Sequence, residues 1–82
     1  MDLVALTEEI VKSLVVHKDG VSVKEFPTEE ENVILVQVMV EEEDMGRVIG
    51  KEGRTANAIR TLVQASSALH ENKYVKIDID KF

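Results

Sequence analysis

The spacing of apolar residues predicts two amphipathic helices. In residues 3–16 the apolar side chains recur every three or four positions, as expected for a helix that buries one face. Asp2 stands where it can cap the first turn of this helix. A second, longer helix is predicted over residues 55–70. Its apolar positions are Ala56, Ala58, Ile59, Leu62, Val63, Ala65 and Leu69.

Three other stretches predict β-strands. Residues 21–26 and 74–80 alternate between apolar and polar positions, which is the pattern of a strand with one buried face. Residues 33–40 are apolar apart from Gln37 and rich in β-branched side chains, so we expect a central strand. The acidic run that follows ends at Asp44, which we expect to cap a short helix that reaches Ile49.

The predicted elements follow the order αββααβ without a long linker, and they indicate a single α+β domain over residues 1–82. The polar turn at residues 27–32 is short enough to join the first two strands as an antiparallel hairpin. The two helices before the last strand form a crossover long enough for parallel pairing. We therefore expect a mixed sheet with strand order 1-2-3 and helices on one face.

The residues that join the two later helices carry the clearest functional signal. Gly50 and Gly53 bracket Lys51 and Glu52 in a Gly-x-x-Gly pattern. Residues 46–70 carry a net charge of +3, whereas the rest of the chain sums to −9. The basic residues of this segment are Arg47, Lys51, Arg54 and Arg60. An acidic chain that gathers its arginines around a glycine loop is typical of a phosphate-binding site.

A Gly-x-x-Gly pair also occurs in plain turns between helices, where glycine accepts a positive φ angle. The context favours a phosphate cradle, because a helix begins at the loop and its first N–H groups lack partners within the helix. Two nucleotide-binding motifs do not fit. Gly46 and Gly50 are separated by three residues rather than the four of a P-loop, and Gly-x-Gly-x-x-Gly is absent.

The segment VIGKEGRTANAIRTL resembles the Gly-x-x-Gly signature of K-homology (KH) RNA-binding domains. The predicted element order is similar to type II KH domains, and the whole chain resembles the short bacterial KH proteins of the KhpA (YlqC) family. This resemblance implies that the loop binds the backbone of about four nucleotides of single-stranded RNA. Bases would lie on an apolar groove formed by both helices and the second strand. The implied RNA-binding residues are Arg47, Val48, Ile49, Gly50, Lys51, Glu52, Gly53, Arg54, Ala56, Ile59 and Arg60.

The same resemblance implies partners besides RNA. Members of the family are described as self-associating and as pairing with a larger KH-containing protein linked to cell shape, and a role as RNA chaperone or post-transcriptional regulator is suggested. The apolar positions of the long helix cover about half of its circumference, more than a surface helix needs. Either the sheet and the preceding helix cover all of them, or one edge packs on a second copy as a homodimer. That edge consists of Ala58, Leu62, Ala65 and Leu69.

Other classes of function find no support in the sequence. The chain has no cysteine, its two histidines have no partner at ligand spacing, and no serine stands in a nucleophile motif. We therefore expect no enzyme activity, no metal and no cofactor. No apolar stretch approaches the roughly 20 residues that span a bilayer, so we expect a cytoplasmic protein without membrane contact.

A second function stays open at this point. The chain could be a KH-fold protein-interaction subunit whose RNA contact is marginal or supplied by a partner. The net charge of −6 favours this alternative, as does Ala56, which stands where the KH pattern prefers a larger aliphatic residue. The reversed charge of residues 46–70 favours RNA.

Overall fold

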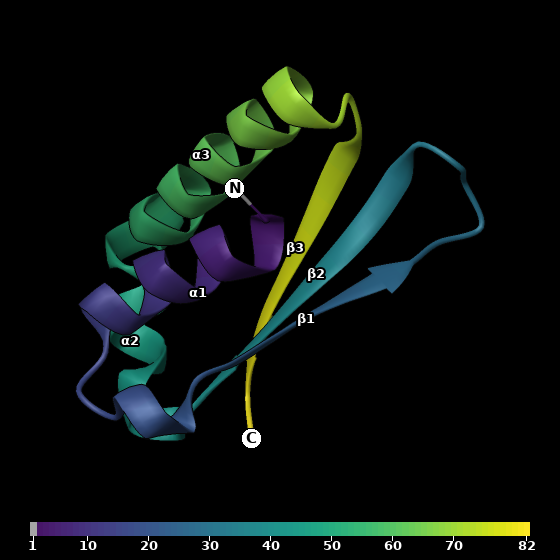
Figure 1. Ribbon diagram of the computed structural model, residues 1–82. Coiled ribbons are helices and arrows are strands. Elements are labelled where there is room, and N and C mark those ends of the chain that lie inside the picture. The colour runs from purple at the N-terminus through teal and green to yellow at the C-terminus, as the bar shows by residue number, and fades with distance from the viewer. Residues whose placement is uncertain (1) are drawn as a thin grey trace.

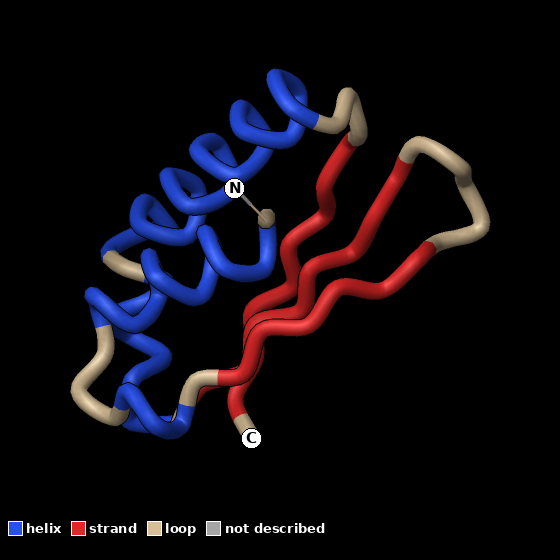
Figure 2. Tube along the Cα trace, in the orientation of Figure 1, coloured by secondary structure: helices blue, strands red, loops and turns tan. Residues whose placement is uncertain are grey.

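The helices of the computed structural model, which describes residues 2–82, cover one face of a three-stranded β-sheet (Figure 1). Helices and strands form two separate layers (Figure 2). The elements are α1 (Leu3–Leu14), β1 (Ser22–Pro27), β2 (Val33–Val40), α2 (Met45–Ile49), α3 (Arg54–His70) and β3 (Tyr74–Lys81). Their order confirms the predicted αββααβ arrangement and the α+β class.

The sheet has the predicted order β1-β2-β3 and is mixed. β1 runs antiparallel to β2, with Val23 opposite Val38, because the connection at residues 28–32 is a short hairpin turn. β2 runs parallel to β3, with Val36 opposite Ile77. The parallel pair is possible because α2 and α3 carry the chain back across the sheet between the two strands.

The core lies between the sheet and the helices, and β2 runs through its centre. Every second residue of β2 is buried, which is the period-2 pattern of a strand covered on one face. These inward residues are Ile34, Val36, Val38 and Val40. They belong to one hydrophobic cluster with Leu3 and Val11 of α1, Val48 of α2, Ile59 and Val63 of α3, and Val75 and Ile77 of β3.

Within residues 2–82, no helix lies on the other face of the sheet (Figure 1). Val33, Leu35, Gln37 and Met39 of β2 lie on that face and are half-buried. β2 is therefore central, as predicted, but its second apolar face has no covering layer. Neighbouring strands give it partial cover instead.

The element ends differ from the predictions by one or two residues. α1 stops at Leu14, because Val15 adopts an extended conformation and turns its side chain into the core. β1 begins one residue late and includes Pro27. Proline is tolerated there because β1 is an edge strand, so a missing N–H need not break a ladder.

Asp44 corrects one prediction. Its side chain does not cap α2. The buried carboxylate accepts hydrogen bonds from the backbone N–H groups of Val16 and His17, both at 3.0 Å. The guanidinium of Arg47 lies 3.3 Å from the same carboxylate. Asp44 therefore ties the exit of α1 to the segment that leads into α2.

The environment of Asp44 sets its protonation. Burial alone raises the pKa of Asp44, but the hydrogen bonds from the backbone of Val16 and His17, with electrostatic attraction from His17 and Arg47, outweigh burial and hold the pKa below its usual value. The ring Nε2 of His17 also lies 2.9 Å from Glu43, which adds a second contact across this junction.

This arrangement predicts an acid-sensitive junction. Because the folded state lowers the pKa of Asp44, its contribution to stability is present at neutral pH and is lost as pH falls below about 4. The variant Asp44→Asn should lower the melting temperature at neutral pH by about 5 °C or more. It should also show a shallower loss of stability in acid. Thermal melts of wild type, Asp44→Asn and the exposed control Asp78→Asn test this. An Asp44→Asn variant with the acid dependence of wild type would contradict it.

Candidate nucleic-acid interface

The glycine loop is a tight turn between α2 and α3. Gly50 ends α2 with φ 76° and ψ 174°, and Gly53 precedes α3 in the left-handed conformation with φ 75° and ψ 12°. The N–H of Gly53 donates to the carbonyl of Gly50 at 3.2 Å, which closes the turn. Glu52, between them, also adopts a positive φ of 55°.

The two glycines serve different purposes. A Cβ at Gly50 would overlap the Thr55 hydroxyl and lie 2.9 Å from the Thr55 backbone nitrogen, so no side chain fits there. A Cβ at Gly53 would meet no atom within 4 Å. Gly50 is therefore required by the packing of the loop on α3. Gly53 keeps the outside of the loop open to an approaching molecule.

The start of α3 adds positive potential to the loop. Gly53 is the N-cap residue and has no side chain to accept a hydrogen bond from the first turn. The N–H groups of a helix N-terminus that lacks a side-chain cap carry partial positive charge and suit an anion. The N–H of Arg54 donates to the carbonyl of Lys51, so the loop combines open space at Gly53 with the partial positive charge of the helix start rather than with a full set of free donors.

The basic residues around the loop differ in how free they are. Lys51 is exposed, and within residues 2–82 its side chain makes no hydrogen bond or ion pair. Arg54 is also exposed, but its Nη2 lies 3.4 Å from the carboxylate of Glu52. Among the basic residues around the loop, Lys51 is therefore the most available to bind a phosphate.

The other two arginines already have intramolecular contacts. Arg47 donates to the carbonyl of Glu43 at 3.1 Å and pairs with the buried Asp44. Arg60, in the second turn of α3, contacts the side-chain oxygen of Asn57 at 3.3 Å. Both residues remain exposed, so they can still attract a phosphate from a distance.

Three residues that were expected on the binding surface are buried. Val48 is fully buried, and Ala56 and Ile59 are each 2% exposed. They belong to the helix faces that pack on the sheet. Their side chains therefore support the loop from inside the core and are not accessible to a nucleobase. The remaining apolar residue of the expected set, Ile49, is half-buried. The aliphatic side chains of β2 point into the core or onto the helix-free face, so that strand does not wall the groove.

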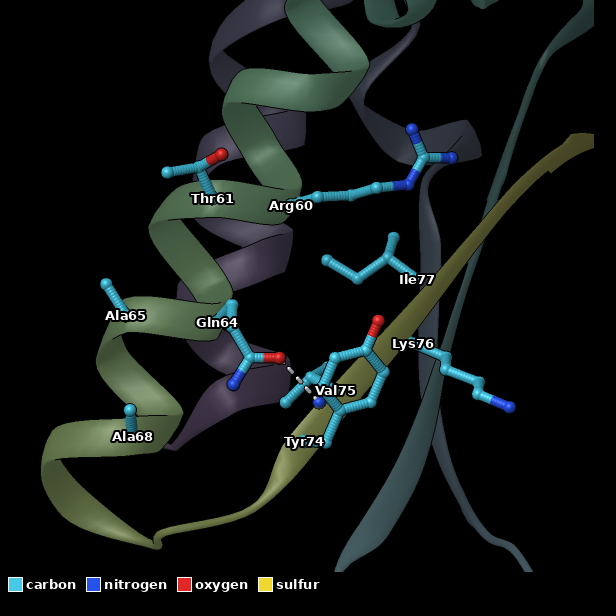
Figure 3. A pocket seen from close by; sticks show the side chains of 9 residues that line it. All are labelled: Arg60, Thr61, Gln64, Ala65, Ala68, Tyr74, Val75, Lys76 and Ile77. Atoms are coloured by element: carbon cyan, nitrogen blue, oxygen red, sulfur yellow. Dashed lines mark hydrogen bonds between the residues drawn. The ribbon is translucent and has the colours of Figure 1, made fainter.

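A groove lies instead between α3 and β3 (Figure 3). It is an open hollow of about 600 Å³. Its lining consists of Arg60, Thr61, Gln64, Ala65 and Ala68 from α3, and Tyr74, Val75, Lys76 and Ile77 from β3. In Figure 3 the side chain of Arg60 extends from α3 toward β3, and the ring of Tyr74 stands in front of the strand. Arg60 is the one residue shared with the set expected from sequence.

Hydrogen bonds hold the two walls of this groove together at one end. The amide of Gln64 donates to the carbonyl of Lys73 at 3.0 Å and accepts from the N–H of Val75 at 2.9 Å. The hydroxyl of Ser67 donates to the same carbonyl at 2.8 Å. The start of β3 is therefore fixed against α3 at this end of the groove.

Sequence reasoning missed Tyr74 and Lys76. Both alternate with the inward residues Val75 and Ile77, and the parallel pairing places β3 at the free edge beside α3. The available signal in the sequence was an aromatic residue at the start of an alternating strand. In the structure Tyr74 is 58% exposed.

The expected apolar edge of α3 lies outside the core. Ala58, Leu62, Ala65 and Leu69 are all exposed, with Leu62 at 57% and Leu69 at 81%. Within residues 2–82, neither the sheet nor the preceding helix α2 covers these side chains. Ala65 also lines the groove, so the edge and the groove meet along one side of α3.

The element order, the glycine loop and the groove can now be compared with known proteins. The model of the KhpA/KhpB KH domain matches residues 4–79. The chain belongs to the KhpA/KhpB family of KH domains. A relative from Clostridium perfringens named RNA-binding protein KhpA is 50% identical over 74 residues, which cover 90% of this chain and 95% of the relative. One of the same name from Clostridium acetobutylicum is 51% identical with the same coverage.

Solved structures agree with the fold of this KH domain. A variant of Aquifex aeolicus Era bound to GDP and AlF4− aligns with all of this chain and 32% of its own, with a TM-score of 0.65 and 20% identity. Era in complex with MgGDPNP and nucleotides of 16S ribosomal RNA aligns with a TM-score of 0.61 and the same identity, over 99% of this chain and 31% of its own. At this identity the likeness concerns the fold alone.

Two further observations concern residues 2–82. None of their helices is long and apolar enough to cross a membrane. No three histidine, aspartate or glutamate side chains among them come together as a metal site.

The different environments of the two glycines predict different costs of substitution. Gly50→Ala combines a backbone conformation reserved for glycine with a clash against Thr55, and should cost about 3 kcal/mol of unfolding free energy. Gly53→Ala meets no atoms and should cost only about 1 kcal/mol for the left-handed conformation. Urea unfolding of both variants beside wild type measures the difference. Equal costs at the two positions would show that Gly50 is not held by Thr55.

Proposed function

We propose that this KH domain binds single-stranded RNA, with the phosphate backbone at the glycine loop and the bases along the α3–β3 groove. The open space at Gly53, at the start of α3 and beside Lys51, whose side chain has no partner within residues 2–82, is the observation that carries the proposal. The names of the relatives, which are RNA-binding proteins, support it.

The backbone of RNA fits the loop for chemical reasons. Phosphate oxygens accept hydrogen bonds from helix N–H groups and from Lys or Arg, and close approach needs a loop without a side chain in the way. Gly53 offers that approach, and Lys51 and Arg54 flank it. Gly50 shapes the loop, while Arg47, Ile49 and Glu52 border it.

The groove beside the loop suits unstacked bases. Its walls offer the aromatic ring of Tyr74, the small side chains of Ala65 and Ala68, and the guanidinium of Arg60. Aromatic and guanidinium planes stack on bases, and small residues leave room for them. A duplex holds its bases inside the helix, so we expect single strands to be preferred. Val48, Ala56 and Ile59 hold the loop and α3 in place beneath this surface.

The proposal predicts a strong effect of Lys51. Lys51→Glu places a carboxylate against phosphate and should weaken binding of a single-stranded RNA at least about tenfold, with little change in stability because Lys51 is exposed. If the loop and groove neutralise about three or four phosphates, log K should fall against log salt with a slope of about −2 to −3 in wild type.

Fluorescence anisotropy over a salt series measures both quantities. Lys24→Glu, on the exposed side of β1, is the matched control for net charge and should bind RNA nearly as wild type does. If Lys51→Glu and Lys24→Glu bind equally well, the loop is not the phosphate site.

We further propose that a second chain packs on the exposed edge of α3. Ala58, Leu62, Ala65 and Leu69 form an apolar strip that the monomer leaves open, and such strips favour association. A homodimer related by a two-fold axis would bring the two strips together. A larger KH-containing protein is the alternative occupant, and a cytoplasmic role as RNA chaperone or post-transcriptional regulator is consistent with either assembly.

This strip also favours the second candidate function, a protein-interaction subunit in which RNA contact is secondary. The intramolecular contacts of Arg47, Arg54 and Arg60 point the same way, because RNA must compete with them. The two functions differ in what Lys51→Glu does: it weakens an RNA-binding protein at least about tenfold in RNA affinity and leaves a pure protein-interaction subunit unaffected.

The assembly proposal is tested at Leu62, which is more than half exposed and contributes little to the core of its own chain. Leu62→Glu should give a folded monomer, because a charge in the interface is desolvated and faces its own copy. Wild type should sediment as a dimer at micromolar concentration. A wild type that remains monomeric at the highest accessible concentration would disprove the homodimer. Thr61→Glu, on the groove side of α3, is the control for an added charge on this helix.

A further inference from the structure

We propose that Glu52 is a built-in competitor of the RNA phosphate. In the free protein its carboxylate holds the guanidinium of Arg54, and RNA must displace it before Arg54 can bind the backbone. Glu52 would thereby keep the affinity below what the basic residues of the loop could give. This inference rests on the proposed RNA-binding function and names what tunes it.

The geometry of the loop brings the two groups together. Oε2 of Glu52 lies 3.4 Å from Nη2 of Arg54. The residues flank Gly53, which is the open point of the loop. The carboxylate of Glu52 therefore lies where a phosphate oxygen would approach the loop. It contacts the Arg54 guanidinium that the phosphate would also bind.

Glu52 holds its position despite an unfavourable backbone conformation. Its φ and ψ of 55° and 25° lie in the left-handed region, which is favourable for glycine and asparagine and unfavourable for glutamate. Glu52 is also the only acidic residue between positions 46 and 70. The one acid in a basic segment thus stands at the centre of the candidate phosphate site.

The other acid near the patch cannot play this role. Asp44 pairs with Arg47, but it is fully buried and bound to two backbone N–H groups, so it is fixed in the fold. The side chain of Glu52 is 66% exposed and that of Arg54 is 77% exposed. The carboxylate of Glu52 is therefore free to move away from its arginine, whereas the carboxylate of Asp44 is fixed by its backbone contacts.

The chemistry favours exchange rather than blockade. A carboxylate and a phosphodiester both carry negative charge and accept the same guanidinium hydrogen bonds. An exposed ion pair is weak, so a phosphate that also contacts Lys51 and the start of α3 can replace the carboxylate. The expected result is a moderate affinity that rises when Glu52 loses its charge.

A double-mutant cycle tests this contact. Wild type, Glu52→Gln, Arg54→Gln and the double variant are titrated against a fluorescent single-stranded RNA of about twelve nucleotides, which is longer than the segment that the loop holds. Glu52→Gln should raise the affinity about threefold to fivefold at low salt, and the gain should shrink at higher salt. In the Arg54→Gln background the same change should gain less than about twofold.

Two controls make the result specific. Glu29→Gln, in the turn between β1 and β2, removes an exposed acid far from the loop and should leave the affinity unchanged. Circular dichroism checks that each variant is folded. Glu52→Asn, which suits a positive φ, replaces Glu52→Gln if the latter does not fold.

The outcomes separate this inference from the function beneath it. If Lys51→Glu weakens RNA binding but Glu52→Gln binds as wild type does, the competitor is disproved and the RNA site stands. If Glu52→Gln gains equally with and without Arg54, Glu52 acts through its charge alone, and the proposed contact is overturned. If Lys51→Glu and wild type bind RNA alike, the proposed function fails and the inference fails with it.

Discussion

Burial of the inner face of β2 is the interaction on which the rest of this structure depends. Val36, Val38 and Val40 are completely buried, and the side chains that bury them come from all three helices and both neighbouring strands. Because α3 must cover this face with Ile59 and Val63, its axis and rotation are fixed against the sheet. The N-terminus of α3, and with it the glycine loop, is thereby held at one end of the layer of helices (Figure 1). Packing in the core determines where a phosphate could bind.

Electrostatics then separates this end from the rest of the surface. The chain is acidic overall, yet its long α-helix begins among four basic residues. Two of these basic residues, Arg47 and Arg54, are partly neutralised by Asp44 and Glu52, and Arg60 donates a hydrogen bond to Asn57. Attraction to RNA would therefore be local and moderate, and the acidic remainder of the surface would repel nucleic acid from other sites. Such a balance suits exchange of RNA better than tight retention.

The sequence predicts the fold well and the site in part. Periodicity locates α1, α3 and the three strands of residues 2–82 to within about two residues, because each buries one face and its spacing reports that directly. The loop is predictable since two glycines and their basic neighbours are contiguous in the chain. Three other features depend on tertiary packing and could not be predicted from the sequence. Asp44 acts across 28 residues on Val16 instead of capping its own helix. Val48, Ala56 and Ile59 turn inward. The groove needs β3 beside α3, which brings Tyr74 close to Gln64.

The circumference of α3 explains why its surface is hard to assign from spacing alone. One side of the helix packs on the sheet through Ile59 and Val63. The next side lines the groove with Gln64 and Ala68. The side after that is an exposed apolar surface, which includes Leu62 and Leu69. Ala65 belongs to the last two at once. A larger residue there would intrude on the groove and on any chain packed against the strip, so a small side chain is the one solution that leaves both surfaces usable. The proposed RNA site and the proposed interface are therefore adjacent on one helix, and Ala65 borders both.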